Sequence, residues 1–399
     1  MGGTIVVASC QRTAGREQLS IATTSAVILG SGVLSSIVAA RVLGPDDRGL
    51  LVAWQVWALA IGTLASFGLP QVAVTMRDVR WGQIWTTQVV GATIGALLAS
   101  LVVHALSAGP PAVVGAAFLA LGTGLNGSQA AWHQRSGHLM WRFNTQRLTP
   151  SLGLLLSTLI LALSPLRDPE IWLLVISATQ LSATVMVGLV HGLGPRIEWS
   201  GLNLPVLRQA VATTPISWLS YIQYRADILL ASLLLTPAQV AFYSIASAVE
   251  GAIFALGQTF GMRWFSQHRS APVRRAAMTT FASTGIAATA FAFLSGPLIV
   301  LAYGDEFAGA TPTALILCFA AVPRALDYLF THVAIARGRI VRVSILKALG
   351  ITGLTMAAIW ISTEGATAAK LAFLALLTAV VLCVAQAISL RADHRRAHS

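Results

Sequence analysis

Apolar runs of about 17 to 25 residues alternate with short polar connections along the whole chain. A run of about 20 apolar residues forms a helix long enough to cross the ~30 Å hydrocarbon core of a bilayer. The runs cover residues 19–40, 50–75, 84–106, 112–132, 148–163, 171–190, 210–235, 240–265, 276–302, 313–336, 341–361 and 368–388. This pattern predicts an all-α, polytopic membrane protein with about twelve transmembrane helices.

The composition agrees with this prediction. Of the 399 residues, 56% are hydrophobic and only 10% are charged. A soluble domain of this size has too little interior to hide so much apolar surface, whereas a bilayer accepts it. The bilayer is therefore the first partner that the sequence implies.

The basic residues are distributed unevenly over the connections. Nearly all arginines lie on the terminal segments and on alternate connections, and the opposite set of connections holds only Arg41, Arg48, Arg167 and Lys370. Because Lys and Arg accumulate on the cytoplasmic side, this predicts that both termini lie in the cytoplasm. The net charge of +12 then reflects orientation, and no nucleic-acid partner is expected.

A short motif recurs in the two halves of the chain. The connection LGPDDRG after the first run matches LTPAQVA after the seventh, at Leu43 and Leu235, Pro45 and Pro237, and Gly49 and Ala241. The same spacing separates all three pairs and divides the twelve runs into six and six, which predicts a parallel repeat of two six-helix bundles. The expected organisation is a cytoplasmic lead (1–18), a first bundle (19–190), a cytoplasmic linker (191–209), a second bundle (210–388) and a cytoplasmic tail (389–399).

Six charged residues lie away from the ends of the predicted helices, and all of them belong to the second bundle. They are Arg225, Asp227, Glu250, Arg324, Asp327 and Lys347. A charge at the centre of a membrane helix costs about 2.5–3.5 kcal/mol on insertion scales, so each should face protein or a watery cavity. Two interpretations stay open: the groups line a substrate or proton site, or they only neutralise one another.

Local spacing bears on these alternatives. Arg324 and Asp327 stand three residues apart and could pair on one helix face. Lys347 lies close enough to the cytoplasmic end to extend toward the headgroups. Arg225 and Asp227 are two residues apart, so their side chains point to different sides of a helix.

The first bundle has no predicted mid-span cation. Its polar residues at depth are neutral, namely Gln55, Asn126, Gln129 and Gln180, and Arg147 is assigned to the connection before the fifth run.

We find no enzymatic constellation. The chain has no P-loop, its three cysteines (Cys10, Cys318 and Cys383) lack metal-ligand spacing, and no long outer connection can carry an active site. We therefore expect neither enzyme activity nor a metal or cofactor.

Four sequence blocks follow one another along the chain. These are IVAARVLGPDDRGLLVAWQVWALAIGTLASFGLPQVAV (37–74), YRADILLASLLLTPAQVAFYSIASAVE (224–250), LAYGDEFAGATP (301–312) and the segment ending near Ala336. In the second block an Arg-x-Asp sequence precedes a short turn and the aromatic pair Phe242 and Tyr243. Together the blocks resemble the (Wzx-like) polysaccharide flippases of the multidrug/oligosaccharidyl-lipid/polysaccharide exporter superfamily.

The resemblance implies two six-helix lobes that alternate between inward-open and outward-open states. It implies a lipid-linked oligosaccharide as cargo, carried on polyprenyl pyrophosphate, with polysaccharide polymerase and glycosyltransferases as possible partners. Arg41 matches the arginine of the family's first motif, and Arg225 and Arg324 are deeper cations suited to a pyrophosphate. Asp227, Glu250 and Asp327 are carboxylates that could couple transport to protons.

Two rival functions remain. A cation-coupled drug exporter of the same superfamily would require acidic residues in the core of the first bundle, where the sequence predicts none. A non-transporting scaffold for envelope enzymes would tolerate neutralisation of Arg225 or Arg324.

Overall fold

The computed structural model describes residues 2–76, 78–135, 139–193, 204–267, 273–337 and 339–396. Most of the predicted linker, residues 194–203, lies outside this part of the chain. The described residues form helices and contain no strand. Ten of these helices are long and apolar enough to cross a membrane, so the chain is a multi-pass membrane protein.

The chain divides into two compact units. The first unit consists of Met1–Val42 and Trp54–Thr214, and the second of Leu43–Ala53 and Pro215–Ser399. The first connection, which carries the LGPDDRG motif, therefore belongs to the second unit although it follows the first predicted helix. Spacing along the sequence did not indicate that this connection belongs to the second unit.

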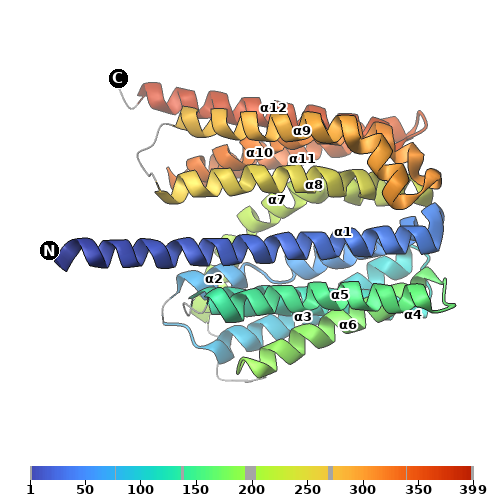
Figure 1. Ribbon diagram of the computed structural model, residues 1–399, viewed down its shortest axis with the longest axis horizontal. Coiled ribbons are helices and arrows are strands. Elements are labelled where there is room, and N and C mark those ends of the chain that lie inside the picture. Colours follow the sequence, from blue (N-terminus) through green and yellow to red (C-terminus); the bar gives the residue numbers. More distant parts are fainter. Residues whose placement is uncertain are drawn as a thin grey trace. The chain divides into compact units, whose positions relative to one another are not determined.

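The helices of the first part of the chain are α1 (Gly2–Leu64), α2 (Leu69–Thr75), α3 (Trp81–Ala105), α4 (Pro110–Arg135), the π-helix η1 (Leu139–Phe143), α5 (Asn144–Leu163) and α6 (Pro169–Val190). Helix α1 contains the first predicted span and most of the second, separated at Gly44, where φ is +73°. Figure 1 shows the long first stretch of α1, in dark blue, leading away from the N-terminus.

The second predicted span ends early because the helix breaks at Phe67 and Gly68, both with positive φ. Pro70 lies in the first turn of α2, where backbone N–H groups have no partner within the helix. Its missing N–H therefore costs no helical hydrogen bond. The first unit's core gathers here around Leu69, Trp81 and Trp85, together with Val206 and Ala210 from the start of α7 (Leu204–Leu234).

The rest of the chain forms α8 (Pro237–Gln267), α9 (Val273–Tyr303), the 3-10 helix η3 (Asp305–Ala310), α10 (Thr311–Ala336), α11 (Ile340–Ser362) and α12 (Ala368–Arg396). Small residues such as Ala288, Cys318 and Ala321 fill the contacts between α9 and α10. Large apolar side chains such as Phe293 (82% exposed) and Leu349 (63%) point outward, as expected where lipid is the solvent.

Candidate functional site

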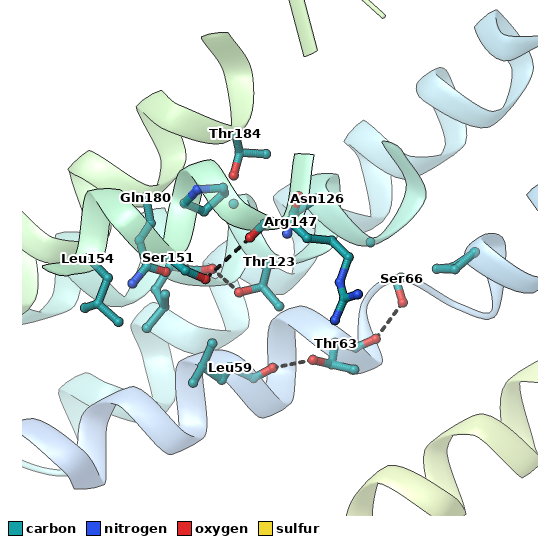
Figure 2. Close-up of a pocket in the computed structure, with 15 residues that line it drawn as sticks. Leu59, Thr63, Ser66, Thr123, Asn126, Arg147, Ser151, Leu154, Gln180 and Thr184 are labelled. Carbon is teal, nitrogen blue, oxygen red and sulfur yellow. Dashed lines mark hydrogen bonds between the residues drawn. The ribbon is translucent and has the colours of Figure 1, made fainter. Parts of the chain in front are cut away.

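A cavity of about 400 Å³ with both apolar and polar lining residues lies within the first unit, between α1, α2, α4, α5 and α6 (Figure 2). It is lined by Leu59, Thr63, Ser66, Pro70, Leu119, Gly122, Thr123, Asn126, Gly127, Arg147, Pro150, Ser151, Leu154, Gln180 and Thr184. None of these fifteen residues is acidic, and Arg147 is the one that carries a charge.

The lining follows the period of the α-helix. On α4 the contributing positions include Leu119, Thr123 and Asn126, and on α6 they are Gln180 and Thr184. Residues three, four and seven apart share one helix face, so each helix presents one face to the same space.

Arg147, which the sequence assigns to the connection before the fifth run, is part of a helix and lines this cavity. The structure places it inside α5, which begins at Asn144 and continues directly from η1. Figure 2 shows its side chain reaching from α5 toward the part of the cavity lined by Thr63 and Ser66. The guanidinium carbon lies 5.3 Å from the ring centroid of Phe143, and no acidic side chain in the described part of the chain pairs with it.

The hydroxyl groups of the cavity mostly donate back to their own helices. Thr63 donates to the carbonyl of Leu59 at 2.8 Å, and Thr123 donates to that of Leu119 at 2.7 Å. Such a hydroxyl oxygen keeps its lone pairs for a ligand donor. The cavity therefore offers hydroxyl acceptors beside the donors of Arg147, which is the mixture that a polyhydroxylated ligand requires.

A buried amide network holds one side of the cavity in place. Gln146 donates from Nε2 to Asn126 Oδ1 at 3.0 Å and to Gln129 Oε1 at 2.7 Å. Asn126 accepts with its oxygen, so its amide N–H groups are not used in this contact, and Asn126 is one of the residues that line the cavity. Gln146 is fully buried and thus positions Asn126 without lining the cavity itself.

The second unit contains an ion-pair network inside the membrane helices. Arg324 on α10 contacts Asp227 on α7 at 2.8 Å and Glu250 on α8 at 2.6 Å. Tyr243 donates its hydroxyl to Asp227 Oδ2 at 2.7 Å, and the amide of Ile228 donates to Oδ1 at 2.9 Å. One guanidinium thus faces two carboxylates, so the trio carries a charge of −1 when all three groups are ionised.

A second ion pair joins α10 to α11. Asp327 Oδ2 is 3.7 Å from the ammonium of Lys347 on α11, and it accepts from Gln223 at 3.0 Å and from the Tyr224 hydroxyl at 3.4 Å. Two interpretations from local spacing are therefore wrong: Arg324 does not pair with Asp327, and Lys347 does not extend to the headgroups, because its side chain is fully buried.

The remaining predicted cations lie elsewhere. Arg225 is exposed while Asp227, two residues later, is buried, as the helical spacing predicted. Arg41 is also exposed. Arg48, which we expected at the outer rim, is buried in the second unit with 8% exposure. The structure thus joins Asp227, Glu250 and Arg324 in one network and Asp327 and Lys347 in another.

No family model matches the sequence, and no curated protein matches it. Solved structures do share its architecture. The lipid II flippase MurJ, in its inward closed conformation, superposes with a TM-score of 0.70 and 12% identity over 93% of this chain and 87% of that one. An inward-facing multidrug resistance MATE transporter of the MOP superfamily gives 0.64 and 12%, over 91% and 93%.

A mutant of the MATE transporter VcmN from Vibrio cholerae gives a TM-score of 0.58 and 15% identity over 96% of this chain and 98% of that one. These structures are transporters, and each is matched over most of its length. The predicted fold class is confirmed: the chain is an all-α membrane protein with the fold of multidrug/oligosaccharidyl-lipid/polysaccharide (MOP) exporters.

Proposed function

We propose that the chain is a flippase that moves a lipid-linked oligosaccharide, carried on polyprenyl pyrophosphate, across the bacterial inner membrane for cell-surface polysaccharide synthesis. The observation that supports this best is the cavity of the first unit. It combines hydroxyl and amide groups with a single cation, Arg147, and none of its lining residues is acidic.

The chemistry of the cavity suits such a cargo. Sugar hydroxyls both donate and accept hydrogen bonds, and the cavity supplies acceptors at Thr63 and Thr123 and donors at Asn126 and Arg147. A guanidinium binds phosphate or carboxylate oxygens through two parallel hydrogen bonds. Since no acidic residue pairs with Arg147 within the described chain, an anionic group of the cargo is the ligand that we assign to it.

The ion pairs of the second unit suit a coupling role. Asp227 and Glu250 share Arg324, so one carboxylate can take up a proton while the other keeps its ion pair. We propose that this exchange, with Asp327 and Lys347 as a second pair, drives alternating access of the two units. Arg324, which pairs with both carboxylates, acts there as the switch between them. The exposed Arg41 and Arg225 are further candidates, beside Arg147, for binding the pyrophosphate.

A cation-coupled drug exporter is the second candidate, favoured by the three buried carboxylates Asp227, Glu250 and Asp327. A cationic drug in the first unit's cavity would meet the charge of Arg147 without an opposing carboxylate, which is unfavourable at low dielectric. The two candidates therefore predict different effects of neutralising Arg147. Glycan transport should be strongly reduced if the cargo is a lipid-linked oligosaccharide, whereas export of a cationic drug should improve or stay unchanged.

The test is a reconstituted flipping assay. Purified protein is placed in liposomes with a fluorescent polyprenyl-pyrophosphate trisaccharide, and a membrane-impermeant quencher reports the fraction on the outer leaflet. Arg147→Ala should lower the flipping rate at least tenfold, and Arg147→Lys should restore only part of it, because an ammonium replaces a bidentate fork.

The matched control is Arg142→Ala, which removes an exposed arginine from η1, five residues before Arg147 and outside the cavity. It should flip at the rate of the intact protein. Full activity of Arg147→Ala, or an equal loss in both variants, would contradict the proposed role of the cavity.

A further inference from the structure

Lys347 is chemically unusual in this chain. The sequence contains only two lysines against 24 arginines, and Lys347 is fully buried inside the second unit. The other, Lys370, is exposed and donates to the backbone carbonyls of Glu364 and Gly365. A lysine ammonium is a compact point charge, unlike the planar guanidinium that the chain uses almost everywhere else.

The groups around the ammonium are those that bind a small cation. Lys347 Nζ lies 3.7 Å from Asp327 Oδ2 and donates to the amide oxygen of Gln223. It also lies 5.2 Å from the ring centroid of Tyr224. A carboxylate, an amide oxygen and an aromatic face are ligands that alkali-metal ions and ammonium share.

One further oxygen of this cluster has no partner. Asp327 is 1% exposed, and its Oδ1 atom makes no hydrogen bond within the described chain, whereas Oδ2 accepts from Gln223 and Tyr224. Buried carboxylate oxygens are normally satisfied. The cluster therefore holds one more oxygen ligand than the tethered ammonium uses.

We propose that Asp327, Gln223 and Tyr224 form a binding site for a monovalent alkali cation, and that the ammonium of Lys347 occupies this site in place of a free ion. The intact protein accordingly takes no sodium at this position. Removal of the ammonium leaves a buried carboxylate without a counter-charge, and Na⁺ then binds there. The inference concerns this site alone and does not depend on the nature of the cargo.

The experiment compares sodium binding in detergent-purified proteins. Binding of radioactive Na⁺ is measured directly, and the midpoint of thermal unfolding is recorded in sodium chloride and in choline chloride at equal ionic strength. Lys347→Ala should bind Na⁺ at least tenfold more tightly than the intact protein, and its midpoint should rise in sodium chloride. Lys370→Ala, which removes the exposed lysine, should behave like the intact protein.

The double variant Lys347→Ala/Asp327→Asn should lose the new sodium binding, because the carboxylate is gone. Sodium binding of equal affinity in the intact protein and in Lys347→Ala would overturn the proposal, as would a folded Lys347→Ala that binds no Na⁺. If Lys347→Ala is not recovered folded in either salt, Lys347→Met keeps the apolar stem in place and removes only the charge. A folded Lys347→Met without sodium binding would equally overturn the proposal.

Discussion

Gly49 lies against the backbone of Pro237, so that a methyl group on Gly49 would overlap the Pro237 carbonyl oxygen. The two residues belong to the two connections whose sequences match, LGPDDRG and LTPAQVA. Because residues 43–53 are part of the second unit, the matching connections meet within one unit. Gly49 permits this close approach because it has no side chain.

The first prediction tests this contact. Gly49→Ala should destabilise the protein by about 1–3 kcal/mol, since the added methyl group forces backbone atoms apart. Gly353→Ala is the control, because nothing lies within 4 Å of a methyl group at that position of α11. Helix propensity favours alanine there by about 1 kcal/mol. Thermal unfolding in detergent should therefore shift the two midpoints in opposite directions, and a lower midpoint in both variants would contradict the contact.

The second prediction concerns the trio of Arg324, Asp227 and Glu250. Arg324→Gln leaves two buried carboxylates without a counter-charge, which costs about 3–5 kcal/mol for a buried ion pair. Adding Asp227→Asn and Glu250→Gln to that variant removes the uncompensated charges, so the unfolding midpoint should largely recover.

The control for this experiment is Arg324→Gln/Asp327→Asn. Asp327 is the partner that spacing along α10 suggests, but it pairs with Lys347. Neutralising Asp327 should therefore not restore the unfolding midpoint of Arg324→Gln and should lower it further. If this double variant were as stable as the triple variant, the observed pairing of Arg324 would be wrong.

These pairs mark the limit of what sequence predicts. The membrane helices could be located because each requires about 20 apolar residues, a property of contiguous sequence. Arg324 and its partners are separated by 97 and 74 positions, so only the packing of α7, α8 and α10 brings them together. The nearby Asp327 satisfied the local rule and was the wrong partner.

Arg147 was missed for a related reason. It lies close to Trp141 and Arg142, which are typical of a connection at the membrane surface, and the apolar run begins only at Leu148. The π-helix η1 and the start of α5 at Asn144 extend the helix over this segment. Asn144, Arg147 and Ser151 are spaced as on one face of a helix, and this spacing could have indicated that the helix includes Arg147.

The third prediction separates positioning from binding in the first unit's cavity. Gln146→Leu removes the donor to Asn126 and Gln129 and leaves two amide oxygens without that bond, at a cost of about 1–3 kcal/mol each. Asn126 is then free to reorient. The trisaccharide concentration for half-maximal flipping should rise more than the maximal rate falls.

Thr149→Val is the comparison on the same helix, because the Thr149 hydroxyl donates only to the carbonyl of Thr145. It should leave both kinetic parameters close to those of the intact protein. A Gln146→Leu protein with an unchanged half-maximal concentration would show that Asn126 does not take part in binding.

The last prediction tests the orientation in the membrane. Helix α9 runs from Val273 to Tyr303, and its two ends differ in charge. The exposed Arg274 and Arg275 stand at its start, and η3 with Asp305 and Glu306 follows its end.

Because arginines mark the cytoplasmic side, a cysteine replacing Arg274 should react with a membrane-impermeant thiol reagent only after the cells are opened. A cysteine replacing Ala308 should react in intact spheroplasts. Cys10 would be replaced by serine in both variants, whereas Cys318 and Cys383 are buried. Reaction of both positions from the same side would mean an even number of crossings between them, or none, and would contradict the assignment of both termini to the cytoplasm.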